Sequence, residues 1–195
     1  MKAINKQLPR KNPESGFALL MTLIVVTVVI SIGLSVLDLS IKQVRLSTNA
    51  RDSEIAFHAA NAGMECARFW RRSGSDEMES GQSFAINCFS STVNSIPVEV
   101  SNTSDGEVYR YDYAVSWGEF APRCSQITTL VASSSVLGSG LVIPNMNALV
   151  PGYPSDTKDC EAGERCTVIS VRGYNKACAN VSQYGTVQRE VLLQF

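Results

Sequence analysis

Residues 17–37 form an uninterrupted apolar run, FALLMTLIVVTVVISIGLSVL, which limits what the chain can fold into more than any other feature. The run has 21 residues without a formal charge, and 14 of them are Leu, Ile, Val or Phe. As an α-helix it measures about 31 Å, close to the roughly 30 Å hydrocarbon thickness of a bilayer. We therefore predict a helix that spans a membrane once.

A short basic leader, residues 1–16, precedes this run. It carries Lys2, Lys6, Arg10 and Lys11 and ends in Glu14-Ser15-Gly16. An ordinary secretory signal has a shorter apolar core of about 7 to 15 residues with a small-residue cleavage site after it. Here the core is longer and no A-x-A pattern follows it, so the break point is expected before the core. The basic residues favour a cytoplasmic leader and an outward-facing C-terminal part.

The glycine boundary at Gly16, the Phe17 that follows it and the long apolar helix resemble the leader of type IV prepilins. Residues 59–67, AANAGMECA, resemble the N-terminal module of PilX-type minor pilins. This resemblance implies cleavage between Gly16 and Phe17 by a prepilin peptidase, with N-methylation of Phe17. It also implies contacts with other pilins or minor pilins and with an inner-membrane assembly platform. The precursor would cross the cytoplasmic membrane once, and the processed chain would enter a pilus or pseudopilus at the cell surface.

One departure from the major-pilin pattern lies at Met21, the fifth position after the expected cleavage. Major pilins usually carry Glu there, and a carboxylate in hydrocarbon implies a paired partner. The apolar Met21 predicts a tip or initiating minor pilin rather than the repeating subunit. Two alternatives stay open: a pseudopilin of a type II secretion system, and a signal-anchored adhesin or binding module that keeps its leader.

Length and charge limit the part beyond the membrane to one compact domain. The chain has 195 residues, with 17 basic and 18 acidic side chains. Removing the leader's four basic residues and one Glu leaves 13 basic and 17 acidic side chains, a net charge of −4. Such a charge disfavours a surface that binds nucleic acid. The expected division is a leader (1–16), a transmembrane helix half (17–37), an extramembrane helix half (38–72) and a β-rich head (73–195) with a loop-rich insertion at about 127–160.

The helix is expected to run from 17 to 72, because no proline occurs between Pro13 and Pro97. Its last turns carry an apolar stripe expected to pack against the head. The stripe and its neighbours include Ile55, Ala59, Ala62, Gly63, Cys66 and Phe69. In the membrane half, Gly33 with Ser31 and Ser35 is either a small-residue patch for a neighbouring helix or a surface that tolerates lipid.

The fold class expected from these elements is α+β, a pilin-like plan in which the helix packs on an antiparallel sheet. Runs rich in Val, Ile, Tyr and Phe predict strands at 84–88, 96–100, 108–117, 167–174 and 187–195. In the third run, Tyr109, Tyr111 and Tyr113 share one face. The last run is apolar enough to be an inner strand.

Six cysteines fit the outward placement of the head: Cys66, Cys88, Cys124, Cys160, Cys166 and Cys178. Their even number and the lack of C-x-x-C spacing favour three disulfides over a zinc ribbon or a redox motif. Fifteen pairings are possible, with a preference for Cys160–Cys166, whose short loop contains Gly163. Reduced, buried cysteines are the alternative.

The sequence offers little for catalysis. His58 is the only histidine and lies within the helix pattern, so a structural protein without catalytic residues or cofactor is expected rather than an enzyme. Asp156, Asp159, Glu161 and Glu164 could hold Ca²⁺, but their spacing matches no EF-hand. A solvated acidic loop without metal is the favoured interpretation.

Overall fold

A single long helix, α1 (Ser15–Ser73), begins the part of the chain that the structure describes. This computed structural model describes residues 15–119 and 121–195, so the leader residues 1–14 lie outside it. The chain divides into two units, Met1–Thr48 and Asn49–Phe195. The first unit contributes residues 15–48 of α1, and the second contains the rest of the helix and every strand. The helix was predicted over 17–72, which differs by one or two residues at each end.

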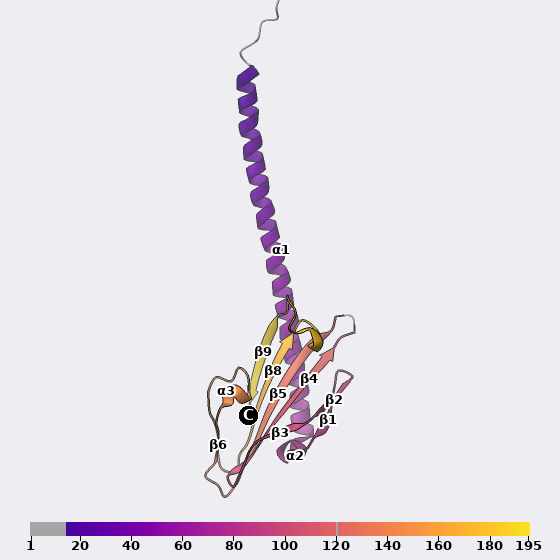
Figure 1. Ribbon diagram of the computed structural model, residues 1–195, viewed down its shortest axis with the longest axis vertical. Helices are drawn as coiled ribbons and strands as arrows, with labels where there is room; N and C mark the ends of the chain where they lie inside the picture. Colours follow the sequence, from indigo (N-terminus) through magenta and orange to yellow (C-terminus); the bar gives the residue numbers. More distant parts are fainter. Residues whose placement is uncertain (1–14, 120) are drawn as a thin grey trace, which may run out of the picture. The chain divides into compact units, whose positions relative to one another are not determined.

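The second unit is an antiparallel sheet with a helix on one face (Figure 1). Five strands have the order β3-β4-β5-β8-β9, and two hairpins, β1-β2 and β6-β7, lie outside this sheet. The elements are α2 (Ser75–Glu79), β1 (Phe84–Cys88), β2 (Ser91–Ser95), β3 (Pro97–Thr103), β4 (Gly106–Trp117), β5 (Arg123–Ser134), β6 (Leu141–Ile143), α3 (Met146–Leu149), β7 (Lys158–Cys160), β8 (Arg165–Tyr174), the 3₁₀ turn η1 (Cys178–Asn180) and β9 (Gln188–Gln194). The predicted α+β class with a helix on an antiparallel sheet is confirmed.

Small residues let α1 lie directly on β5 and β8. Ala56, Ala59 and Ala60 are fully buried in this contact. On the sheet side, a Cβ added at Gly173 would collide with the backbone of Ala56 and Ala60. The Ser125 hydroxyl donates a 2.7 Å hydrogen bond to the Ala59 carbonyl oxygen. The helix is therefore held at backbone contact distance, which only a side-chain-free residue on the sheet permits.

The alternation of β4 decides which side chains meet the helix. Tyr109, Tyr111 and Tyr113 share one face, as predicted, while Arg110 and Asp112 point to the other face. The face with the tyrosines is the one that the helix covers, and all three are buried there. The Tyr111 hydroxyl lies within 3.1 to 3.3 Å of three carbonyl oxygens at the end of α2 and just beyond it. Burial raises the pKa of Tyr111 to about 12, with Tyr109 adding to the rise and Arg71 opposing it. Burial also raises the pKa of Tyr113, against a smaller lowering by the nearby Thr129 hydroxyl.

A buried ion pair joins the C-terminal end of α1 to α2 and the sheet. Arg71 is 6% exposed, and its guanidinium donates to Glu79 Oε1 at 2.7 Å and to Thr167 Oγ1 at 2.9 Å. Arg165 reaches the second Glu79 oxygen at 3.2 Å. The carboxylate thus receives a donor on each oxygen, which offsets the cost of placing charges in the interior.

The opposite face of the sheet is partly covered by the segment between β5 and β8. Leu141, Ile143, Met146 and Val150 from this segment pack on Leu130 and on other outward-facing residues of β4, β5 and β8. The loop-rich insertion was predicted from about residue 127, and this boundary is wrong because residues 127–134 belong to β5. The strand is covered on both faces, so its residues show no polar alternation that would mark it as a strand.

The last strand also differs from the prediction. Strand β9 was expected to be an inner strand, but it pairs only with β8 and forms one edge of the sheet. Its apolar residues Val191, Leu192 and Leu193 are half-buried. Leu192 packs on the core beneath the insertion, and Val191 and Leu193 pack on the core between the sheet and α1. These contacts, rather than a second strand neighbour, account for their hydrophobicity.

Candidate functional site

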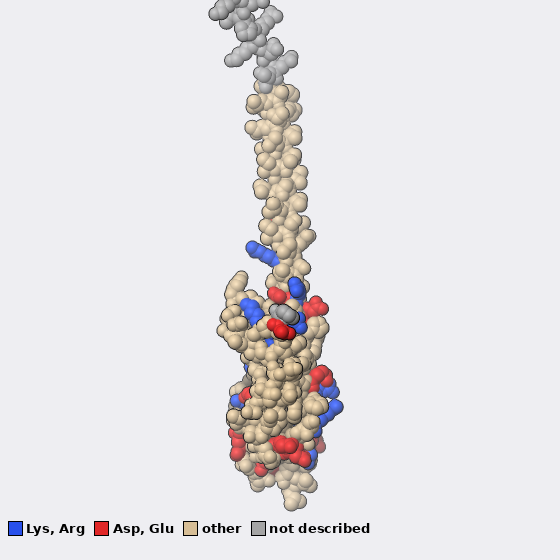
Figure 2. Space-filling view, turned by 90° about the vertical axis from the view of Figure 1, so that its right-hand side faces the viewer, with Lys and Arg blue, Asp and Glu red and all other residues tan. Residues whose placement is uncertain are grey.

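The apolar segment, residues 17–37, is exposed along its whole length. Phe17 is 67% exposed and Leu34 is 65% exposed, although such side chains are normally buried in folded domains. Figure 2 shows this stretch of α1 free of charged side chains, with acidic and basic residues gathered over the rest of the molecule. The helix is long and apolar enough to cross a membrane. An exposed apolar surface of this size needs lipid or other apolar helices around it.

Three of the four hydroxyl side chains of the apolar segment donate hydrogen bonds within the helix itself. Thr22 donates to the Leu19 carbonyl oxygen at 2.9 Å, Thr27 to that of Ile24 at 2.8 Å, and Ser35 to that of Ser31 at 2.9 Å. Because these hydroxyls already have acceptors on the preceding turn, they need no partner from outside. The segment can therefore enter hydrocarbon at a lower cost than its polar residues suggest.

The expected cleavage boundary lies at the start of the described part of α1. Gly16 and Phe17 are exposed, and no atom beyond the local helix lies within 4 Å of where a Gly16 Cβ would stand. The described chain therefore leaves the surface at Gly16 open. The basic residues of the leader lie outside the described residues.

Gly33 does not share a patch with Ser31 and Ser35. Two residues turn an α-helix by about 200°, so Gly33 lies almost opposite the two serines. Gly33 has no neighbour within 4 Å of its missing Cβ, which leaves its surface open. A close helix–helix approach would use either Gly33 or the Ser31/Ser35 pair, not all three together.

The predicted packing stripe is rotated relative to the observed one. Ala59 and Gly63 lie in the buried contact, whereas Ile55, Ala62 and Cys66 are half-buried at its border. Phe69 was expected on this stripe and is instead 61% exposed. The centre of the contact is formed by small residues, namely Ala56, Ala59, Ala60, Gly63 and Ala67. The close approach of the sheet selects for small side-chain volume at these positions.

All six cysteines are paired. Cys66 on α1 joins Cys88 at the end of β1, Cys124 on β5 joins Cys178 on η1, and Cys160 on β7 joins Cys166 on β8. The third pair is the one that the short Gly163 loop favoured. No free cysteine is found in the described part of the chain. The bridges tie the helix, the end of the sheet and the insertion to the head.

Residues considered for catalysis or metal binding are not brought together. His58 is exposed and lies 3.7 Å from the Glu54 carboxylate, one helical turn away. In the loop with Asp156, Asp159 and Glu161, the Glu164 carboxylate accepts a 2.9 Å hydrogen bond from the Glu161 backbone N–H. Over residues 15–119 and 121–195, no cluster of three or more His, Cys, Asp or Glu side chains could hold a metal ion.

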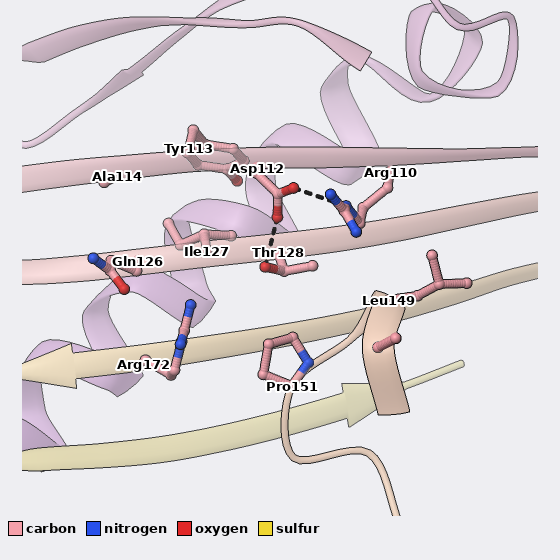
Figure 3. A pocket seen from close by; sticks show the side chains of 11 residues that line it. Arg110, Asp112, Tyr113, Ala114, Gln126, Ile127, Thr128, Leu149, Pro151 and Arg172 are labelled. Carbon is pink, nitrogen blue, oxygen red and sulfur yellow. Dashed lines mark hydrogen bonds and ion pairs between the residues drawn. The ribbon is translucent and has the colours of Figure 1, made fainter. Parts of the chain in front are cut away.

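A polar groove on the uncovered part of the sheet was not foreseen from the sequence. It has a volume of about 500 Å³ and is lined by Arg110 and Asp112 of β4, Gln126 and Thr128 of β5, Arg172 of β8, and residues in and after α3 (Figure 3). These polar residues come from three strands that are far apart in the sequence. The alternation of β4 is the one available signal, because it places Arg110, Asp112 and Ala114 on the face opposite the tyrosines.

Comparison with known proteins supports the resemblance found at the N-terminus. Residues 15–65 match the family model described as PilX N-terminal, which covers about a quarter of the 195-residue chain. No curated protein and no solved structure was found to match the chain. The predicted PilX-type module is therefore confirmed over residues 15–65, and an N-terminal apolar helix in this family fits a membrane-anchored precursor.

Proposed function

We propose that this chain, whose N-terminal quarter matches the PilX N-terminal family, is a minor-pilin-type structural subunit that takes part in type IV pilus assembly. The observation that carries the proposal is the exposed apolar segment 17–37 within the matched region. In the precursor this surface is covered by lipid, and in a fibre it is covered by the helices of other pilins. The match to the PilX N-terminal family supports a structural role.

Processing between Gly16 and Phe17 is part of this proposal. A prepilin peptidase would remove the basic leader before Phe17 and methylate the new Phe17 amine. Gly16 favours this step because a residue without a side chain gives a protease access to an extended backbone beside a bulky helix. The removal of the leader's positive charges would also free the helix from the cytoplasmic face of the membrane.

The head would be displayed on the extracytoplasmic side. Three disulfides tie it together, and such bonds form and persist in oxidising compartments. The bridge Cys66–Cys88 holds the end of the helix to the head, so a pull on α1 is transmitted to β1 through a covalent link. This arrangement suits a subunit that is drawn out of a membrane by its helix.

A position at the tip of the fibre follows from Met21. Without a carboxylate at this position, the subunit has no buried charge to offer a neighbour that adds above it. The expected partners are other minor pilins. Detergent-solubilised chain mixed with the minor pilins of the same system should form a stoichiometric complex, and the lack of any complex would argue against the tip position.

Intact mass and N-terminal sequencing of the chain from its native membrane test the processing step. We expect the loss of residues 1–16, one added methyl group on Phe17 and a deficit of six hydrogens from three disulfides. The Gly16→Val variant should keep its leader, whereas the matched control Gly33→Ala should be processed. A wild-type chain that retains Lys2, Lys6 and Arg10 would instead indicate a permanently anchored head.

A further inference from the structure

The groove on the face of the sheet opposite α1 has the chemistry of a ligand site rather than of an interior gap. Its floor is low because Ala114 and Thr128 carry small side chains, and the end of α3 with Pro151 forms one wall. The insertion packs on the part of this face around Leu130 and Val168, and the part with Gln126 and Arg172 lines the open groove. A volume of about 500 Å³ lies within the usual range of small-molecule sites.

The charges of the groove are arranged in two groups. The charge of Asp112 is neutralised by an ion pair with Arg110, whose Nε lies 2.8 Å from Asp112 Oδ2. The other Asp112 oxygen accepts a 2.7 Å hydrogen bond from Thr128 Oγ1. Arg172 has no hydrogen bond or ion pair from its side chain to any residue of the described chain. Its cross-strand neighbour Glu190 accepts a 2.6 Å hydrogen bond from Ser170 and makes no ion pair with Arg172. The Arg172 guanidinium therefore keeps its N–H donors free in the groove.

A second donor stands beside this charge. Gln126 is the cross-strand partner of Arg172 on β5. The Gln126 amide oxygen accepts a 3.0 Å hydrogen bond from the Tyr174 hydroxyl, which fixes the amide and leaves its NH₂ group free to donate. Figure 3 shows the Arg172 and Gln126 side chains next to each other, with Asp112 and Thr128 farther along the groove. A guanidinium and an amide side by side are suited to a carboxylate.

We propose that this groove binds a sugar acid, a uronate-type ring whose carboxylate lies against Arg172 and Gln126. The ring hydroxyls donate to the free lone pairs of Asp112, and the apolar side of the ring lies along Leu149 and Pro151. A simple inorganic anion brings no hydroxyl donor for the Asp112 carboxylate, whereas the ring of a sugar acid does. Arg172 and Gln126 offer donors, and Asp112 offers an acceptor farther along the groove. This arrangement suits a ligand with both a carboxylate and hydroxyl groups, whereas an acidic peptide would need apolar pockets for its other side chains.

The test uses the full chain in lipid nanodiscs and ligand-observed saturation-transfer NMR with glucuronate as the probe. We expect saturable binding with a Kd of about 1 mM and much weaker signals from glucose, which lacks the carboxylate. Acetate and inorganic phosphate should displace glucuronate only at concentrations roughly tenfold higher than unlabelled glucuronate itself. Equal displacement by acetate or phosphate would show a general anion patch and overturn the assignment.

Single variants distinguish the loss of a ligand contact from a loss of the fold. Arg172→Gln removes the proposed anchor without breaking any observed contact and should weaken glucuronate binding by roughly tenfold or more. Arg72→Gln, on the exposed end of α1 away from the groove, is the matched control and should bind as the wild type does. Asp112→Asn should reduce the preference for glucuronate over acetate. Unchanged binding in Arg172→Gln, or no binding by a wild-type chain with native unfolding behaviour, would contradict the proposal.

Discussion

The contact between α1 and β8 makes Gly173→Ala the sharpest test of the head's packing. An added Cβ would collide with the backbone of Ala56 and Ala60, and it would lie 2.7 Å from the Ala60 Cα. Ordinary Cβ contacts are 3.4 to 4 Å, and backbone atoms cannot move aside as a flexible side chain can. The helix would have to move away from the sheet, which opens its contact along Ala56, Ala59, Ala60 and Gly63.

The expected loss of stability is about 3 kcal/mol, the upper end of the usual cost of overpacking a core. For a head of this size, each kcal/mol lowers Tm by roughly 2 to 4 °C, so Tm should fall by about 9 °C. Near-UV circular dichroism of the oxidised chain in detergent follows this transition. Gly138→Ala is the control, because its Cβ meets chiefly the movable Asp105 side chain at 3.0 Å and should leave Tm nearly unchanged.

Gly63→Ala gives a graded comparison from the other side of the same contact. Its Cβ would lie 2.7 Å from the Ser125 Cβ and 2.8 Å from the Val171 Cγ1, which are side-chain atoms. Alanine also favours a helix over glycine by about 1 kcal/mol, which offsets part of the clash. The loss should therefore be smaller than for Gly173→Ala. A Gly173→Ala chain as stable as the wild type would refute the close helix–sheet contact.

Three further predictions concern charge, pH and the disulfides. Glu79→Ala should cost about 3 kcal/mol in urea unfolding because it leaves Arg71 buried without its carboxylate; an unchanged midpoint would contradict the buried pair. Stability should be complete below pH 10 and decline as the pH rises toward 12, because the folded pKa of Tyr111 is raised to about 12 while the unfolded tyrosine titrates near 10. Tyr111→Phe should make the loss of Tm in this range shallower, and an identical slope would argue against it. Replacing a disulfide by two alanines should cost more stability the longer the loop that it closes. We expect a loss of about 4 kcal/mol for Cys124–Cys178, about 3 for Cys66–Cys88 and about 2 for Cys160–Cys166, whose separations are 54, 22 and 6 residues. Urea midpoints in any other order would contradict the dependence on loop length.

The parts of the fold that follow local rules were predictable from the sequence. The apolar run, the lack of proline before Pro97 and the alternation of Tyr109, Tyr111 and Tyr113 identified α1 and β4. Strand β1 was predicted with its observed bounds, Phe84–Cys88. In each case the residues carry the periodicity of their own element, so neighbours distant in sequence do not alter the result.

The parts that depend on tertiary contacts were not predictable. Most of strand β5 is covered on both faces, so its residues 127–134 carry no alternation and fell within the predicted loop-rich insertion. The short hairpin strand β2, STVNS, has few apolar residues and follows a turn in which Phe89 and Ser90 both adopt positive φ, unusual for residues other than glycine. The groove was not predicted because Arg110, Gln126 and Arg172 come together only when β4, β5 and β8 pair.

If the exposed helix enters a fibre after the leader is removed, the head should be present in purified pili. An antibody against the head can detect it in sheared, purified pili and in the membrane fraction of the same cells. We expect the wild-type head in both fractions and the Gly16→Val head in the membrane fraction alone. A wild-type head confined to the membrane while the cells carry pili, or a Gly16→Val head present in the fibres, would contradict it.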